Sequence, residues 1–226
     1  MNPVPGLTHG VVQKSEPGQL TIQPAPPKPG QGSQPNPLSV QEALLAAPKG
    51  DAEAQYTLGR AYQNGFGVKQ DIAEAATWYQ RAAEQGHLDA QNSLGMLLAV
   101  SRQDYAGAAQ WFGRAAIGGN ADAQYNLGVL CRDGLGSRRN DELAVQWFRK
   151  SAAQGHVEAE KELGKMYESG RGVKPDYLEA YKWLKLAQLQ GDEEVGDELK
   201  ACAASMSRDQ IAAAEKLARE IRAKEK

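Results

Sequence analysis

The sequence predicts an all-α fold, a right-handed α/α superhelix (solenoid) of four helical repeats, on three observations. One phrase recurs as AEAQYTLG, LDAQNSLG, ADAQYNLG and VEAEKELG, which aligns four leucines: Leu58, Leu94, Leu127 and Leu163. All four tryptophans of the chain form a second column: Trp78, Trp111, Trp147 and Trp183. A third column consists of glycines: Gly86, Gly119, Gly155 and Gly191. A period of 33 to 36 residues is typical of a stacked repeat array rather than of separate domains.

Residues 1–37, which precede the array, are predicted to be a disordered tail rich in Pro, Gln and Gly. Nine of the eleven prolines lie there, and no aromatic residue precedes Tyr56. Such a segment buries too little apolar surface to offset the entropy lost on ordering. Its stretch PAPPKPG favours polyproline II, either as a spacer or as a ligand for a small recognition domain.

Residues 38–50 are predicted to form an N-terminal capping helix. Ser39 and Glu42 have the spacing of a capping box, and Pro48 ends the helix.

Residues 51–191 are predicted to be the four repeats, at 51–86, 87–119, 120–155 and 156–191, each with two helices. In the first repeat, Ala54, Leu58 and Ala61 form the apolar stripe of the first helix, and a Gly-x-Gly turn follows. The second helices start at side chains that favour the N-cap: Asp71, Asp104, Asn140 and Asp176. The second repeat lacks the Gly-x-Gly, so a turn three residues shorter is expected there.

A glycine follows each column leucine in the middle of a helix, where it costs roughly 0.5–1 kcal/mol relative to alanine. This cost predicts a compensating close contact of the backbones, with Ala75, Ala108, Ala144 and Ala180 of the second helices opposite Gly59, Gly95, Gly128 and Gly164. The tryptophan beside this seam is expected to fill the space between neighbouring repeats.

Residues 192–226 are predicted to be C-terminal capping helices. Leu199 continues the leucine column, but no tryptophan follows it. Ser207 and Gln210 cap a last helix with a stripe that includes Ile211, Ala214 and Ala218.

The columns AxAQxxLGxxY, GxGV, WY and AAxxG over residues 51–191 closely resemble the Sel-one-like repeat, a relative of the tetratricopeptide repeat. The tail SMSRDQIAAAEKLARE resembles the end segment of many bacterial members. The resemblance implies an all-α solenoid that works as an adaptor, often in envelope, secretion, motility or host-interaction systems.

Composition argues against several classes of partner. The formal charge is −2, so no general attraction to nucleic acid is expected. No apolar run is long enough to span a membrane and no signal peptide is visible, which predicts a cytoplasmic chain, or a periplasmic or secreted one if a signal peptide has been removed. The two cysteines lack a metal-ligand spacing, so no metal site is expected, and no cofactor is expected either. The chain is expected to be a monomer.

No residue is predicted to be catalytic. His87 and His156 recur in the repeat phrase QGH, which favours a structural role, and Cys131 occupies a core column. Some members of the family carry many cysteines at repeat-matched spacing and have been linked to β-lactam binding or hydrolysis. A β-lactamase-like hydrolase that uses Cys131 is therefore kept as an alternative. It is the lesser one, because this chain lacks the repeat-matched cysteines.

Function is predicted on the concave face, which the first helices line. Its outward positions vary between repeats, as expected of a surface that binds a peptide or protein partner with acidic or C-terminal carboxylate character. The predicted partner-binding residues are Tyr56, Arg60, Gln63, Asn92, Met96, Tyr125, Val129, Arg132, Lys161 and Lys165. The alternatives are a solvated face without a partner, or a glycan- or peptidoglycan-associated envelope module with Tyr56, Tyr125 and Asn92 as its contacts.

Overall fold

The structure, a computed structural model, confirms the helical-repeat fold. It describes residues 10–16, 19–24 and 39–224, with side chains from residue 39 onward. The helices are α1 (Val40–Ala46), α2 (Ala52–Asn64), α3 (Ile72–Glu84), α4 (Leu88–Ser101), α5 (Tyr105–Ile117), α6 (Ala121–Asp133), α7 (Asp141–Ala152), α8 (Val157–Ser169), α9 (Tyr177–Leu189), α10 (Gly196–Ala204) and α11 (Arg208–Lys224), with a short 3-10 helix η1 (Ala47–Lys49) after α1. None of these helices combines the length and the apolar character needed to cross a bilayer.

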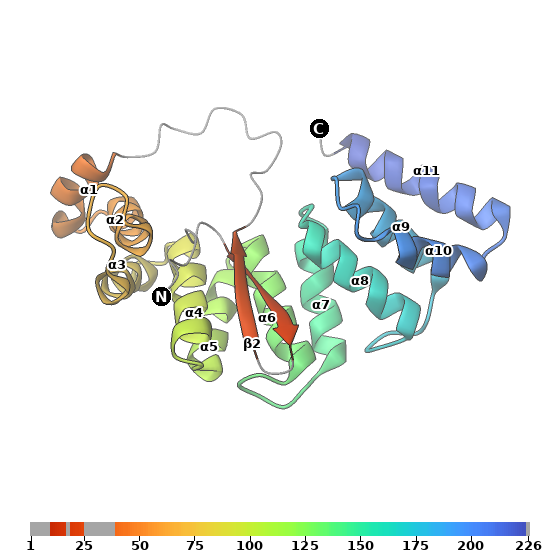
Figure 1. The fold of residues 1–226 in the computed structure, drawn as a ribbon, viewed down its shortest axis with the longest axis horizontal. Coiled ribbons are helices and arrows are strands. Elements are labelled where there is room, and N and C mark those ends of the chain that lie inside the picture. The colour runs from red at the N-terminus through yellow and green to blue at the C-terminus, as the bar shows by residue number, and fades with distance from the viewer. Residues whose placement is uncertain (1–9, 17–18, 25–38, 225–226) are drawn as a thin grey trace. The chain divides into compact units, whose positions relative to one another are not determined.

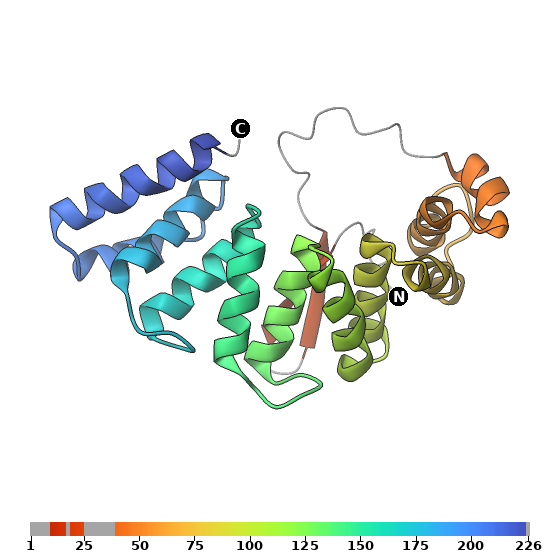
Figure 2. The ribbon, with the colours of Figure 1, turned by 180° about the vertical axis from the view of Figure 1, so that it is seen from behind.

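The chain divides into two compact units, unit 1 (residues 1–126) and unit 2 (residues 127–226), and the division falls within α6. In unit 1, α2 packs on α3, α3 on α4 and α4 on α5 (Figure 1). In unit 2, α7 packs on α8, α8 on α9, and α9 on both α10 and α11 (Figure 2). Apart from α11, the helices named here pack on their neighbours in the sequence, which is how a repeat array builds its core.

The predicted helix ends are confirmed. Ser39 and Glu42 form the reciprocal capping box of α1. The side chains of Asp71, Asp104 and Asn140 each accept a backbone N–H in the first turn of the helix that follows. In the second repeat, which lacks the Gly-x-Gly, the tighter turn is made by Gln103 in the left-handed conformation, with a φ of 53°.

The N-terminal tail differs from the predicted disorder in its described part. Strands β1 (Gly10–Glu16) and β2 (Gln19–Pro24) pair antiparallel, with Val12 opposite Ile22 and Lys14 opposite Leu20. Apolar and polar residues alternate along β2, and alternation with period two favours a strand. The rest of residues 1–37 lies outside the described residues.

The mid-helix glycines do mark a close approach, but the nearest group that each of them meets is a larger side chain and not the predicted alanine. A methyl group on Gly95 would lie 2.7 Å from Cε1 of Phe112, and one on Gly59 would lie 2.6 Å from Cδ1 of Tyr79. Gly128 meets Phe148 and Gly164 meets Leu184 in the same way. The side chain that follows each column tryptophan therefore lies nearest to the missing Cβ. Of the predicted alanines, Ala180 also lies close, with its backbone oxygen 3.2 Å from the Cβ position of Gly164.

The tryptophans join neighbouring repeats in unit 1, as predicted. Trp78 packs against a core that includes Ala43 of α1 and Leu58 of α2. Trp111 packs against a core built from α3 and the helices on either side of it. Trp111 thus covers apolar surface of the first repeat, and Trp78 that of the capping helix and of its own repeat. Arg114 lies over the Trp111 ring at 4.5 Å.

A glutamine column, missed in the sequence, also ties consecutive repeats together. The side-chain amide nitrogens of Gln55, Gln91 and Gln124 donate to backbone oxygens at the end of the preceding helix pair, on Ala47, Ala83 and Ala116, at 3.0–3.1 Å. All three glutamines are buried, so these bonds satisfy groups that would otherwise be costly to bury.

In the fourth repeat this column carries Glu160, which cannot donate such a bond. Glu160 is 1% exposed, and its Oε1 lies 2.7 Å from Nη2 of Arg222 on α11. The same nitrogen donates to the backbone oxygen of Leu186 at 3.0 Å. In the fourth repeat the column residue, Glu160, therefore anchors the C-terminal helix α11. Ala214 and Ala218 of α11 are buried.

Candidate interaction surface

Six of the ten predicted partner-binding residues are buried, so the expectation that their side chains face solvent is wrong. Their exposed fractions run from 0% to 6%, and they are Tyr56, Gln63, Asn92, Met96, Tyr125 and Val129. Arg60, Arg132, Lys161 and Lys165 are half-buried. A role of any of the ten in partner binding stays a prediction.

In unit 1 the buried members hold adjacent helices together. The Tyr56 ring lies 5.8 Å from the Tyr79 ring and 4.6 Å from the His87 ring, centroid to centroid. The Tyr79 hydroxyl donates to Oε1 of Gln63 at 2.5 Å. Burial raises the pKa of both phenols, so each keeps its proton. The repeat spacing cannot distinguish such a packed position from an open one.

Asn92 and Met96 of α4 are engaged in a similar way. The side-chain nitrogen of Asn126 donates to Oδ1 of Asn92 at 3.0 Å and approaches the sulfur of Met96 at 3.5 Å. These contacts join the second and third repeats through buried polar atoms. Asn92 therefore has its acceptor oxygen in use within the fold.

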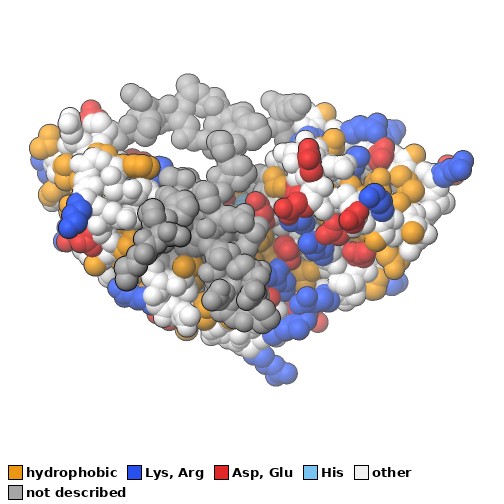
Figure 3. Space-filling model, in the orientation of Figure 1, with side chains coloured by type: hydrophobic (Ala, Val, Ile, Leu, Met, Phe, Trp, Pro, Cys, Tyr) orange, Lys and Arg blue, Asp and Glu red, His pale blue; other side chains and the backbone are white. Residues whose placement is uncertain are grey.

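The three predicted cations of unit 2 are paired with acids. Arg132 bonds to Asp133 and to Glu162 of α8. Lys161 pairs with Asp192 at 2.8 Å and Glu194 at 3.3 Å, and Lys165 pairs with Glu198 at 3.3 Å. Figure 3 shows acidic and basic side chains intermixed over the part of the view where α8 and α10 lie. The positive charge of this stripe is therefore largely neutralised within unit 2.

Arg60 of α2 differs from these three cations. Its guanidinium lies 5.8 Å from the centre of the Tyr56 ring, and its Nε is buried without a hydrogen-bond partner. Among the residues whose side chains are described, no acid forms an ion pair with it. An arginine with unused donors is suited to receive a carboxylate.

One repeat column explains the contrast between the two units. The residue before each column leucine is neutral in the early repeats and acidic later: Thr57, Ser93, Asn126, Glu162 and Glu198. Glu162 and Glu198 are the acids that pair with Arg132 and Lys165. Ser93 and Asn126 supply no charge, so the array neutralises its inner cations in unit 2 and leaves Arg60 without an acid.

The two repeat histidines have structural roles, as predicted. Nδ1 of His87 accepts the backbone N–H of Ala90 at 3.2 Å, and Nδ1 of His156 accepts that of Ala159 at 3.3 Å. Nε2 of His87 also lies 3.0 Å from a carboxylate oxygen of Glu53 in the preceding repeat. Both rings are thus N-caps, and that of His87 links two repeats as well.

The cysteines give no support to a thiol nucleophile. Cys131 is 7% exposed and Cys202 is fully buried, and neither is in a disulfide. Burial raises the pKa of the Cys131 thiol, and raises that of Cys202 to about 11. A thiol that keeps its proton at neutral pH is a poor nucleophile. The side chains described between residues 39 and 224 form no cluster of three metal-ligating groups.

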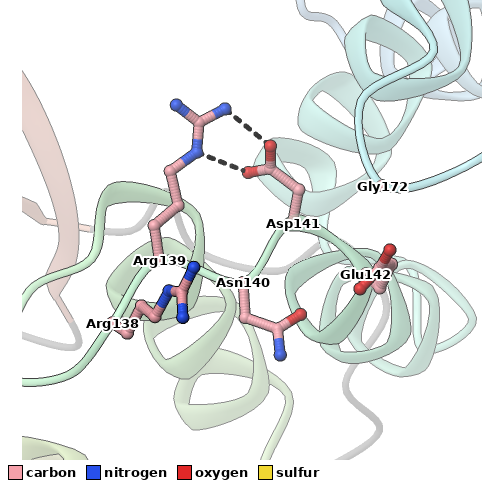
Figure 4. A pocket seen from close by; sticks show the side chains of 6 residues that line it. All are labelled: Arg138, Arg139, Asn140, Asp141, Glu142 and Gly172. Carbon is pink, nitrogen blue, oxygen red and sulfur yellow. Dashed lines mark hydrogen bonds and ion pairs between the residues drawn. The ribbon is translucent and has the colours of Figure 1, made fainter.

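An open hollow of about 690 Å³ lies at the turn before α7, lined by Arg138, Arg139, Asn140, Asp141, Glu142 and Gly172. Figure 4 shows the Arg139 guanidinium pointing at the Asp141 carboxylate, with bonds of 2.6 and 3.1 Å. Arg171 reaches the same carboxylate at 3.1 Å. The Arg139 hydrogen bond, with Arg171, lowers the pKa of Asp141 to about 2. The Asp141 carboxylate in this hollow is therefore already paired, with Arg139 and Arg171.

Comparison with known families finds four consecutive matches to the Sel1 repeat, at residues 52–87, 88–120, 121–156 and 157–192. These ranges begin one residue after those predicted from the sequence columns. They cover more than half of the chain and comprise the helix pairs from α2 to α9.

Similar proteins include both solved structures and curated sequences. A protective antigen of uropathogenic Escherichia coli strains, with an SLR fold, is 32% identical at a TM-score of 0.75, covering 80% of this chain and 40% of that one. A Sel1 repeat protein from Oxalobacter formigenes is 32% identical at a TM-score of 0.66, covering 71% and 65%. Chitin synthase regulator SKT5 of Malassezia restricta is 43% identical over 65 residues, which is 27% of this chain and 4% of the relative. DAP3-binding cell death enhancer 1 of Rattus norvegicus is 37% identical over 62 residues, 27% of this chain and 12% of the relative. The chain thus spans only a small part of these curated relatives.

Proposed function

This chain belongs to the Sel1 repeat family, and we propose that it is an adaptor that binds a segment of a protein partner through the first helices of its repeats. In unit 1 the anchor is Arg60 of α2, which receives an acidic side chain or the C-terminal carboxylate of the partner. The chain performs no reaction in this proposal. Its repeats hold the binding surface in place.

The observation that carries the proposal is that Arg60, unlike the other three cations of the stripe, forms no ion pair with a described acid. Arg132, Lys161 and Lys165 are all paired with acids, whereas Arg60 has a buried Nε without an acceptor. A guanidinium that is paired with no acid can receive a carboxylate of the partner through its terminal nitrogens in a charge-assisted hydrogen bond. The Tyr56 ring beneath Arg60 limits its movement and presents the guanidinium in a fixed place.

The relatives support protein binding in preference to catalysis. One curated relative is named for binding DAP3, and another is named as a regulator of chitin synthase. Both names describe proteins that act on other proteins. The buried, protonated thiols also argue against a hydrolase that uses Cys131.

A peptide-display experiment tests the proposal. The purified chain selects from a random peptide library with free C-termini, and binding of the recovered peptides is then measured by fluorescence anisotropy. We expect enrichment of sequences with acidic residues or an acidic C-terminus. Loss of a charge-assisted hydrogen bond of about 1.5–3 kcal/mol predicts roughly a 10- to 150-fold weaker Kd for Arg60→Gln.

Lys165→Gln is the matched control, because Lys165 occupies the same repeat column as Arg60 but is paired with Glu198. It should leave the affinity for these peptides within about twofold, since its charge is already satisfied. Circular dichroism shows that both variants are folded. Peptides without acidic character, or equal losses in the two variants, would refute Arg60 as the anchor.

A further inference from the structure

The short helix α1 ends in the same way as the second helix of a repeat. The side-chain amide of Gln55 donates to the backbone oxygen of Ala47, just as that of Gln91 donates to Ala83 at the end of α3. The glycine three residues after each acceptor is left-handed, with a φ of 99° after α1 and η1 and of 89° after α3. Residues 40–49 therefore align with the second half of α3 at an offset of 36 residues.

This alignment shows that α1 is apolar where the other second helices are charged. Leu45 is 70% exposed and aligns with Arg81 of α3, Arg114 of α5 and Lys150 of α7, all of which are exposed. Leu44, beside it, is 41% exposed. The buried side of α1 faces the core through Ala43. The two leucines are therefore on the side of α1 that the repeats leave uncovered.

A neighbouring turn extends this apolar surface. Phe66, in the Gly-x-Gly turn after α2, is 57% exposed. The next residue, Gly67, lies against α1, because a methyl group on it would be 3.3 Å from Cγ1 of Val40. Leu44 follows Val40 by one helical turn and so lies on the same side of α1. We call Leu44, Leu45 and Phe66 the α1 patch, and Figure 3 shows hydrophobic side chains at the surface in the region where α1 lies in Figure 1.

Opposite charges flank Leu45 along the helix. Glu42 lies three residues before it and Lys49 four residues after it, so the three side chains share one face. Both charged residues are exposed, and neither forms an ion pair with another side chain of residues 39–224. A two-fold axis between Leu45 and Ala46 sets two α1 helices antiparallel, with Glu42 of each copy beside Lys49 of the other. The exposed face of α1 is thus complementary to itself in both apolar character and charge.

We propose that the α1 patch is a self-association surface, on which a second copy of this chain docks about a two-fold axis. One short helix and one turn bury less than the roughly 1,200–2,000 Å² of a standard interface, so the pairs form and separate reversibly. At high concentration the pair replaces the monomer expected from the sequence. The pairing does not depend on the proposed adaptor function.

Sedimentation equilibrium of the full chain from about 10 µM to about 1 mM tests the pairing. We expect the average mass to rise with concentration from that of one chain toward that of two. Leu45→Arg introduces the cation that the other second helices carry in this column, and it should weaken the association at least about tenfold. Ile117→Arg is the matched control, because Ile117 of α5 is 82% exposed and lies outside the α1 patch. It should leave the association unchanged.

Charge reversal tests whether the occupant is a second copy in the proposed orientation. Lys49→Glu or Glu42→Lys alone brings like charges together across the two-fold axis, so each variant should associate about threefold to tenfold more weakly than the unaltered chain. An equimolar mixture of the two variants restores both opposite pairs, and its association should return to that of the unaltered chain. In Glu42→Lys the Ser39 hydroxyl still accepts the backbone N–H of residue 42, so the N-cap of α1 is kept.

The outcomes separate the possible occupants of α1. The mass of one chain at every concentration would overturn the proposal, and this result is expected if another segment or a different protein covers the patch. Association that Leu45→Arg leaves unchanged would overturn the α1 patch as its site. A mixture that associates no better than its two components would overturn the antiparallel two-fold pair.

Discussion

Replacing Gly95 with alanine tests how the repeats are packed. Gly95 lies in the middle of α4, and its Cα faces the ring of Phe112 on α5. Alanine is the better helix former by about 1 kcal/mol, so an exposed site would gain stability. At Gly95 the added methyl group must instead fit against a buried ring.

The magnitude follows from the distances. The new Cβ would lie 2.7 Å from Cε1 and 2.8 Å from Cδ1 of Phe112. Carbon atoms normally pack at about 3.5–4.0 Å, so the ring has to move by close to 1 Å. Phe112 is 0% exposed and has no open space to enter. Overpacking of this kind costs about 1–3 kcal/mol, which leaves a net loss of about 0–2 kcal/mol after the gain of about 1 kcal/mol in helix propensity.

The assay is urea unfolding of the full chain followed by circular dichroism, with Gly113→Ala as the control. Gly113 lies within α5 with no atom within 4 Å of its added methyl group. The Gly113→Ala variant should therefore have a free energy of unfolding that is higher by about 0.5–1 kcal/mol, from helix propensity alone. In a Phe112→Ala background the ring is gone, and Gly95→Ala should likewise become stabilising.

The sign of the change in unfolding free energy in Gly95→Ala tests whether the Phe112 ring packs on Gly95. An increase in the free energy of unfolding in the unaltered background would refute the packing of the ring onto the glycine. A loss that persists unchanged in the Phe112→Ala background would refute the ring as its cause.

Further predictions concern the turn of the second repeat, the C-terminal anchor and the acid before α7. Gln103→Gly should raise the free energy of unfolding by about 0.5–1 kcal/mol in urea unfolding, because glycine adopts a positive φ without strain but loses more entropy on folding; a decrease would contradict the left-handed turn. Arg222→Met should lower that free energy by about 3–5 kcal/mol, because it leaves the buried Glu160 carboxylate without its arginine, and adding Glu160→Gln should recover most of the loss; an additive double variant would argue against the pair. Asp141 should titrate near pH 2 in an NMR experiment, below its usual 3.8, so its contribution to stability is complete above about pH 4 and is lost as the pH falls toward 2. Asp141→Asn should remove this acid-dependent contribution, and a midpoint near 4 in the unaltered chain would contradict the pairing with Arg139.

The sequence predicted local structure correctly where a residue type has one structural role that depends on its neighbours along the chain. Asp71, Asp104 and Asn140 cap helices because a short side chain with an acceptor oxygen can reach the free N–H groups of the next turn. The glycine and tryptophan columns set the repeat length, and the length sets the stacking. These features depend on neighbours along the chain, which the sequence displays directly.

The sequence pattern could not predict which side chains of the first helices are exposed. Tyr56 and Asn92 share a repeat position with Lys161, and Met96 shares another with Lys165. Tyr56, Asn92 and Met96 are buried, whereas both lysines are half-buried. Their burial depends on which side chains approach from neighbouring helices. No periodic pattern carries that information.

By itself, the amino-acid order determined the helical pairs, their caps, their period and the family to which they belong, because these follow from backbone propensities and spacing along the chain. Tertiary structure alone decided that the rings of Tyr79 and Phe112 fill the glycine seam, that Glu160 anchors the C-terminal helix, and that Arg60 differs from the paired cations of unit 2. The physical reason is that packing, hydrogen bonding and charge neutralisation act through short distances across space, between residues that lie about 20 to 60 positions apart in the sequence.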